Sequence, residues 1–212
     1  MESAELVGYY RRRAAEYEAI YAKPERQADL AVLGKTIPER FEKLRVLEIA
    51  CGTGYWTERI ARRAASLTAT DLAEEPMRIA QSKTYERGNV VFQTANAFAL
   101  PPALGIFDAA FGGFWWSHVP RERIGEFLES LHARLQPGAR VVLFDNRYVE
   151  GNSTPIAATD AAGNTYQDRR LADGSVSRIV KNFPTGVELR RWLGPNLAYE
   201  ELDYYWLAEY QR

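Results

Sequence analysis

The sequence predicts one α/β domain, built on a doubly wound, mostly parallel sheet with helices on both faces. Three observations favour this fold class. Short β-favouring runs alternate with amphipathic helical segments, a glycine-rich turn follows the first run, and 212 residues suit a single domain. Strands that alternate with helices pair in parallel, because each crossover needs a helix of its own. We therefore expect residues 1–212 to form one domain.

The first forty residues predict a helical lid. Residues 3–21 form a charged helical stretch, and a second helical pattern follows over residues 25–33. Four tyrosines recur at near-helical steps beside Arg13, namely Tyr9, Tyr10, Tyr17 and Tyr21. We interpret residues 1–40 as a lid whose aromatic face closes over a site.

Residues 41–146 carry the alternation that predicts the sheet. The strand-like runs are 45–50, 67–71, 90–94, 109–114 and 140–145. Helical segments occupy 57–64, 74–86 and 121–135. Apolar side chains recur at steps of three and four residues through the last of these helices, which indicates one buried face.

The last part of the chain departs from this alternation. Residues 147–183 are largely polar, and Ala172-Asp173-Gly174 marks a turn between two short strands. Because loops longer than about 12–15 residues are usually functional or disordered, we interpret this insertion as a β-hairpin cover over a site. Residues 184–212 predict a helix followed by an aromatic-rich strand at the edge of the sheet.

Composition and charge exclude several classes of function. The chain has 27 Lys+Arg against 28 Asp+Glu, so its net charge gives no overall attraction to a phosphate backbone. We therefore expect no nucleic-acid partner. A single cysteine, Cys51, excludes an internal disulfide and a Cys-rich zinc site, and no metal site is expected. The N-terminal stretch lacks a secretory apolar core, and no run reaches the ~18 uncharged residues of a membrane span. We expect a cytoplasmic protein without a membrane partner.

The glycine turn after the first strand is the main candidate for a binding site. Ligands of open α/β sheets bind at the carboxyl ends of the strands, where this chain has Gly52 and Gly54. Asp71 ends the second strand, where a carboxylate can hold two ribose hydroxyls. A dinucleotide site would need a third glycine where Thr57 stands, and the phosphate-binding G-x-x-x-x-G-K-[ST] motif is missing. S-adenosylmethionine has no phosphate and favours acidic groups such as Glu48, so it fits these residues better.

Residues 45–146 resemble the class I S-adenosylmethionine-dependent methyltransferases, especially the small-molecule branch of ubiquinone and menaquinone biosynthesis. The matching segments stand in family order: VLEIACGTG, ATDLAEEPM, TANAFALP, FDAAFGGF and LQPGARVVLFD. YYRRRAAEYEAIY is similar to the segment that covers the methyl donor in such enzymes. The resemblance implies a Rossmann-like sheet of seven strands, S-adenosylmethionine as donor, S-adenosylhomocysteine as product, and a small-molecule acceptor.

The resemblance also implies which residues hold the donor. Asp71 would hold the ribose, and the adenine would contact Leu72, Asn96 and Ala97. The amino-acid end of the donor would contact the first strand and the glycine turn through Glu48, Ala50, Gly52 and Gly54. Phe114 after the fourth strand, and Tyr17 and Arg13 of the lid, would close over it. Two positions depart from the family pattern. Ala50 stands where glycine is common, and Asn96 replaces an aspartate, although an amide oxygen still accepts a hydrogen bond.

The candidate catalytic residues follow the fourth and fifth strands. Methyl transfer needs a base only for a hydroxyl or carbon acceptor. His118 and Asp145 are the candidates, although His118 could equally cap the next helix. DNA-amine methyltransferases carry an Asn-Pro-Pro-Tyr-type motif where this chain has GFWW at 113–116, so DNA bases are unlikely acceptors.

The nature of the acceptor stays open at this stage. The cover carries several cations with aromatic residues between them: Arg147, Arg169, Arg170, Arg178, Lys181, Tyr148 and Tyr166. Such a mixture suits a planar or acidic small molecule, and an ordinary solvated hairpin explains it equally well. The alternatives to a small-molecule methyltransferase are a methyltransferase that acts on RNA or protein, and a donor-binding protein without turnover.

Overall fold

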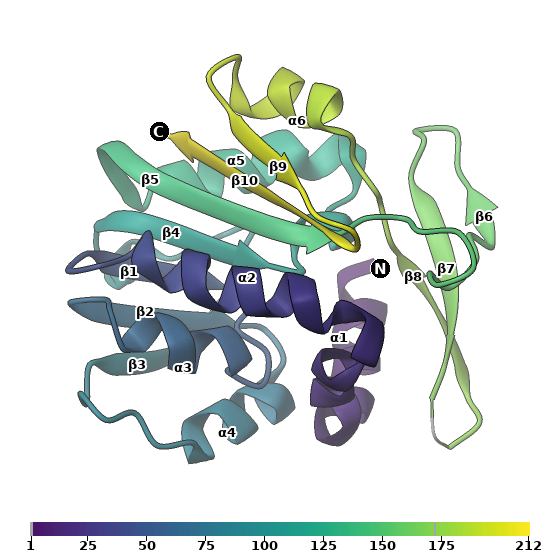
Figure 1. The fold of residues 1–212 in the computed structure, drawn as a ribbon, viewed down its shortest axis with the longest axis horizontal. Helices are drawn as coiled ribbons and strands as arrows, with labels where there is room; N and C mark the ends of the chain where they lie inside the picture. The colour runs from purple at the N-terminus through teal and green to yellow at the C-terminus, as the bar shows by residue number, and fades with distance from the viewer. Residues whose placement is uncertain (1, 172) are drawn as a thin grey trace.

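The computed structural model describes residues 2–171 and 173–212 and shows a seven-stranded main sheet with a smaller sheet beside it (Figure 1). The main sheet has the order β3-β2-β1-β4-β5-β10-β9. Its strands are β1 (Arg45–Ile49), β2 (Ser66–Asp71), β3 (Val90–Thr94), β4 (Phe107–Gly113), β5 (Leu135–Asn146), β9 (Ala198–Glu201) and β10 (Tyr205–Gln211). The first five strands pair in parallel, and β10 runs antiparallel to β5 and β9. The predicted doubly wound, Rossmann-like sheet is confirmed.

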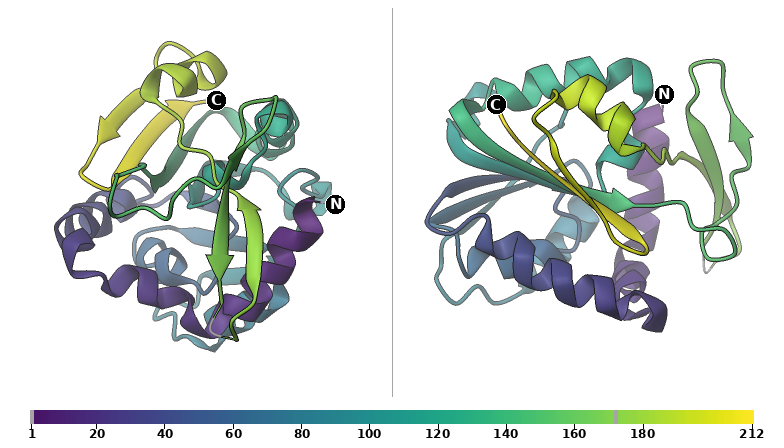
Figure 2. Two further views of the ribbon diagram at one scale, coloured as in Figure 1. Left: turned by 90° about the vertical axis from the view of Figure 1, so that its right-hand side faces the viewer. Right: turned by 45° about the horizontal axis from the view of Figure 1, so that its top comes forward.

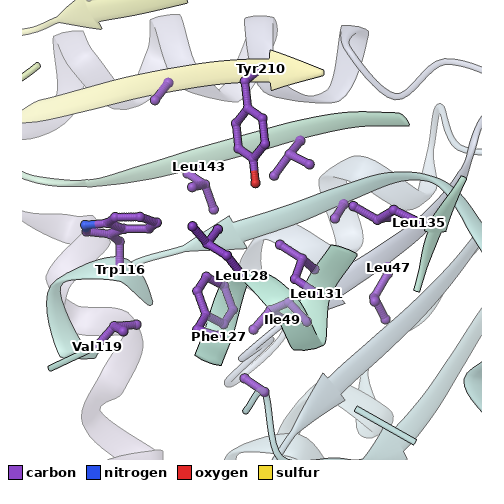
Figure 3. Packing of buried hydrophobic residues seen from close by; sticks show 14 of the residues in the cluster. Leu47, Ile49, Trp116, Val119, Phe127, Leu128, Leu131, Leu135, Leu143 and Tyr210 are labelled. Atoms are coloured by element: carbon purple, nitrogen blue, oxygen red, sulfur yellow. The ribbon is translucent and has the colours of Figure 1, made fainter. Parts of the chain in front are cut away.

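Helices cover both faces of this sheet, because its strands are apolar on both sides. The helices are α2 (Gln27–Glu39), α3 (Tyr55–Ala61), α4 (Glu74–Ser82), α5 (Ile124–His132) and α6 (Gly186–Leu193). On β1, Leu47 packs in the cluster with α5 and α6, and its neighbour Val46 packs in the cluster with α2 and α3. Figure 3 shows the first cluster, where Phe127 and Leu131 of α5 lie beneath the strands. This alternation divides the core into two layers.

Several element boundaries differ from the sequence prediction. The expected helix over 3–21 is α1 (Glu2–Arg13) followed by the 3₁₀ helix η1 (Ala14–Ala22), and η2 (Pro24–Arg26) leads into α2. β5 begins at Leu135 rather than at residue 140. Leu135 already pairs with Phe107, and the register then shifts across Gly138, which has a φ of 77°. Such local irregularities leave little signal in hydrophobic patterning.

The C-terminal tail forms two strands rather than the single edge strand that the sequence predicted. Leu202 donates its backbone N–H to the Tyr205 carbonyl and closes the turn between β9 and β10. β10 lies inside the sheet between β5 and β9, and its Trp206 is fully buried. β9 is the edge strand. The aromatic-rich segment expected at the sheet edge therefore forms the interior strand β10.

The predicted cover is present as a three-stranded antiparallel sheet. It consists of β6 (Ala158–Thr159), β7 (Thr165–Arg170) and β8 (Val176–Val180). Asp173 and Gly174 form the expected turn between β7 and β8, and Ala172 lies outside the described residues. This sheet and α1 lie beyond the carboxyl ends of β4 and β5, as Figures 1 and 2 show. Within the described ranges, no helix has the length and apolar character needed to cross a bilayer.

Candidate functional site

A cavity of about 1260 Å³, its open mouth included, lies at the carboxyl ends of β1, β2 and β4 beneath α1. Eight of the residues that the sequence assigned to the donor line it: Tyr17, Ala50, Gly52, Asp71, Leu72, Asn96, Ala97 and Phe114. His118 lies on the same wall. The structure therefore brings together residues that are up to 101 positions apart.

Strained backbone marks two positions of this wall. Ala50, directly after β1, has a φ of 52°, and Phe114, directly after β4, has a φ of 56°. This left-handed conformation costs a residue other than glycine about 1–2 kcal/mol, and such strain gathers at functional sites. Gly52 adopts the same region at a φ of 54°, and a Cβ there would lie 3.9 Å from the Tyr17 ring. The turn thus brings main-chain atoms to the cavity without side chains in front of them.

Asp71 connects the glycine turn to the end of β2. Its Oδ2 accepts from the Gly52 backbone N–H at 2.8 Å, and its Oδ1 accepts from the Ala73 N–H at 2.7 Å. Burial raises the pKa of Asp71, and the backbone donors oppose that shift. A carboxylate offers about four acceptor positions, so about two remain for a ligand. This side chain both shapes the turn and presents oxygen atoms to the cavity.

Three residues that the sequence assigned to the donor do not line this cavity. Glu48 is buried inside β1, and burial raises its pKa to about 8. Gly54 caps α3, where a Cβ would lie 2.7 Å from the Ala80 Cβ, so glycine is needed for close packing. Arg13 lines a neighbouring cavity instead. A direct role of these three in donor binding stays a prediction.

His118 is held at both ring nitrogens. Nδ1 lies 2.7 Å from the Val180 carbonyl oxygen, and Nε2 lies 2.7 Å from the Tyr10 hydroxyl oxygen. Because a carbonyl only accepts, Nδ1 carries the proton and Nε2 accepts from Tyr10. Burial lowers the pKa of His118, and the nearby charge of Lys181 lowers it further. His118 is thus a neutral residue that ties α1 to the cover, and its role as a base stays a prediction.

Asp145, the other candidate base, is fully buried and lies on neither cavity wall. It forms an ion pair with Lys181, whose Nζ is 3.0 Å from Oδ1, and its Oδ2 accepts from the Ser117 N–H at 2.9 Å. Burial favours a raised pKa, but the charge of Lys181 and the hydrogen bonds from backbone N–H groups together outweigh it and hold the pKa of Asp145 below its usual range. A carboxylate paired in this way is a weak proton acceptor.

A second cavity adjoins the first. The two share Tyr10, Tyr17, Phe114, His118 and Ile179. Five cationic side chains line the second cavity, namely Arg13, Lys23, Arg26, Arg169 and Lys181.

The cations of the cover therefore divide into two groups. Arg169 and Lys181 lie on the wall of the second cavity. Arg147 and Arg178 form ion pairs with Glu201 and Asp168, and Arg170 is exposed; of these three, Arg178 also lines the first cavity.

Sequence reasoning missed two kinds of site residue. Arg26 was placed only within a helical pattern, and its one signal is its position two residues after the helix-breaking Pro24. Leu6 and Val7 line the first cavity, although only tyrosines and Arg13 of this helix were singled out. Among the described residues, no group of three or more His, Cys, Asp or Glu side chains is placed to hold a metal ion.

The comparisons with known proteins agree with this geometry. The family profile described as "Methyltransferase domain" matches residues 46–138. The ubiquinone biosynthesis O-methyltransferase of Xanthomonas axonopodis pv. citri is 33% identical over 153 residues, which cover 70% of this chain and 60% of that protein. The Xylella fastidiosa enzyme of the same name is 30% identical over 77% of this chain and 63% of its own length. The chain thus spans less than two thirds of these curated relatives.

Two solved structures match almost the whole chain. A DhpI–SAH complex has a TM-score of 0.80 and 28% identity, and the match covers 99% of this chain and 95% of that one. A DhpI–SAM–HEP complex has a TM-score of 0.78 at the same identity and covers 100% and 97% of the two chains. With the strand order and the glycine turn described above, these matches lead to one conclusion: the chain belongs to the class I S-adenosylmethionine-dependent methyltransferase family.

Proposed function

We propose that this protein transfers a methyl group from S-adenosylmethionine to a small-molecule acceptor and releases S-adenosylhomocysteine. The observation that carries the proposal is the Asp71 carboxylate, which is fixed by the N–H groups of Gly52 and Ala73 and presents its remaining lone pairs at the cavity. The names of the curated relatives and the ligands of the two DhpI complexes support the same donor chemistry.

The wall residues suit the separate parts of such a donor. Asp71 would accept from the two ribose hydroxyls, and the side chain of Asn96 lies on the wall where the adenine edge would lie. Phe114 and Tyr17 present aromatic rings, which attract a cation such as a sulfonium. The bound donor would supply an activated methyl group with a good leaving group. The protein then has to align the acceptor and exclude water.

The cover over the site favours a small acceptor. Tyr10 of α1 bonds to His118, and Arg12 of α1 donates to the Ser177 hydroxyl of β8 at 2.8 Å. These contacts close α1 against the hairpin above the cavity. A methyltransferase that acts on RNA or protein would need a more open approach, and we regard it as the second candidate. A cytoplasmic location and the absence of a nucleic-acid partner remain predictions.

Binding of S-adenosylhomocysteine by calorimetry tests the proposal. Asp71→Asn should weaken this binding by about 10- to 150-fold, because a hydrogen bond to a charged group contributes about 1.5–3 kcal/mol. Asp108→Asn is the matched control, since Asp108 lies at the opposite end of β4 in an ion pair with Arg45. It should leave the affinity unchanged. Binding of NAD instead, without any response to S-adenosylhomocysteine, would overturn the proposal. If S-adenosylhomocysteine binds as expected, a metabolite screen with labelled methyl donor identifies the acceptor.

A further inference from the structure

The second cavity is placed to receive the acceptor. It adjoins the donor cavity through the side chains of Tyr10, Tyr17, Phe114 and His118. Its other walls come from η2, from the loop after β5, and from β7 and β8. A molecule bound there therefore lies directly beside the donor cavity and beneath the same cover.

The charge of this cavity is one-sided. Its described lining includes five cations and no Asp or Glu side chain. Among the residues that the structure describes, Lys181 is the only one of the five with a carboxylate partner, the buried Asp145. Arg13 donates to the Tyr9 hydroxyl at 2.6 Å, and its guanidinium lies 5.8 Å from the centroid of the Tyr17 ring. The cavity therefore carries a strong positive potential.

Arg26 shows the imbalance most clearly, because it is only 9% exposed. Its guanidinium donates to three neutral oxygens, those of Asn146 at 2.9 Å, Asn152 at 2.8 Å and Tyr205 at 3.5 Å. Its buried Nε has no hydrogen-bond partner among the described residues. A buried charge held only by neutral groups is costly and favours the approach of an anion.

Arg169 of β7 repeats this arrangement in the same cavity. Its Nη1 donates to the Thr154 hydroxyl at 2.9 Å, and its Nη2 donates to the Gln167 side-chain oxygen at 2.7 Å. Its Nε is likewise buried and unpartnered within the described ranges. Burial lowers the pKa of Arg169, and the charges of Arg13 and Arg26 lower it further. The guanidinium groups therefore repel one another until an anion is bound.

We propose that the second cavity is an anion subsite and that the acceptor is a small molecule with a compact oxyanion, such as a carboxylate, phosphate or phosphonate. Guanidinium groups present paired N–H donors that match the oxygens of these groups, and the guanidinium-bearing side chains of Arg26 and Arg169 both line this cavity. The proposal rests on the proposed function, because an acceptor must share the site with a methyl donor. It adds the chemical class of that acceptor.

Titration of the full-length protein with inorganic phosphate and with acetate tests the subsite. The titrations are done by calorimetry at constant ionic strength, with S-adenosylhomocysteine at saturation. We expect saturable one-to-one binding of at least one of these anions. Arg169→Gln should raise its Kd by about tenfold or more, because charge-assisted contacts are lost. Arg170→Gln should change it less than twofold, since Arg170 is the next residue on β7 and is exposed.

The two anions distinguish the possible oxyanions. Tighter binding of phosphate indicates a phosphate or phosphonate acceptor, and tighter binding of acetate indicates a carboxylate. Arg26→Gln should act like Arg169→Gln, but Arg26 also holds the loop after β5, so its effect counts only if its melting temperature is unchanged. Absence of saturable binding, or equal effects of Arg169→Gln and Arg170→Gln, would overturn the subsite. The titrations are repeated without S-adenosylhomocysteine, so that a failure of donor binding is seen separately.

Discussion

Replacing Lys181 with methionine should destabilise the protein strongly. Lys181 is 4% exposed, and its Nζ donates to the Asp145 carboxylate at 3.0 Å and to the Ser117 hydroxyl at 2.6 Å. Methionine has a similar shape but no charge, so Lys181→Met leaves the fully buried Asp145 without its counter-charge. The ion pair joins the end of β5 to the end of the cover, so the loss affects both.

The expected loss follows from the burial of the pair. Removing one partner of a buried ion pair costs about 3–5 kcal/mol. For a chain of this length, each kcal/mol lowers the melting temperature by about 2–4 °C, so the fall should be roughly 6–20 °C. Without Lys181 the pKa of Asp145 would rise above its unfolded value. The variant should therefore lose stability as the pH rises above the ordinary pKa of aspartate, where only the unfolded state releases the proton.

Urea denaturation followed by circular dichroism measures the loss. Asp145→Asn combined with Lys181→Met should recover part of the stability, because the amide oxygen can still accept from the Ser117 N–H without an unpaired charge. Asp168→Asn is the control, since it removes an ion pair with Arg178 at the surface of the same cover. It should cause no measurable change. A loss below about 1 kcal/mol for Lys181→Met would refute the reasoning about burial.

Three further predictions follow from the described geometry. Glu48 has a pKa of about 8 in the fold, so the wild type should lose stability as the pH rises from 4.5, the pKa of this group in the unfolded chain, to 8. Denaturation at several pH values should show the free energy of unfolding of Glu48→Gln rising relative to that of the wild type over this range, by at most ~3–5 kcal/mol. Gly54→Ala should lower the melting temperature, because Gly54 has a φ of 78° and an added Cβ would collide with Ala80. Gly34→Ala is the control: Gly34 lies within α2 and an added Cβ there meets no atom within 4 Å, so the free energy of unfolding should rise by about 1 kcal/mol. Amide exchange should show residues 6–21 more protected when S-adenosylhomocysteine is bound. Tyr10→Phe should weaken this protection in the free protein, because it removes the hydrogen bond to His118. Equal protection with and without the ligand would make this segment a plain structural helix.

The donor cavity could be predicted from the sequence because its signals are local. The glycine turn is contiguous with β1, and Asp71 stands at the end of a recognisable apolar run. The rule that ligands bind at the carboxyl ends of parallel strands then brings these residues together. Side-chain position relative to the wall was harder to infer, as Glu48 shows: it is on the expected strand but is buried and does not line the cavity.

The second cavity could not be predicted, because it depends on contacts between distant parts of the chain. Arg26 meets Asn146 and Asn152, which are 120 and 126 positions away. Its burial follows from the packing of η2 against the loop after β5, and hydrophobic periodicity does not describe such packing. The left-handed backbone at Ala50 and Phe114 was equally hidden, since neither residue type favours it.

The two cavities draw mainly on different stretches of the chain, although both also take residues from α1, η1 and the cover. Residues between Arg45 and Phe114 build most of the donor wall, whereas the cationic wall comes from the first 26 residues and from residues 146–183. An insertion that leaves β5 and returns before α6 can be exchanged without altering the register of the main sheet. Evolution, or a protein engineer, can therefore alter the acceptor preference through this insertion and keep the glycine turn and Asp71, although the cover residues that also line the donor cavity have to be retained.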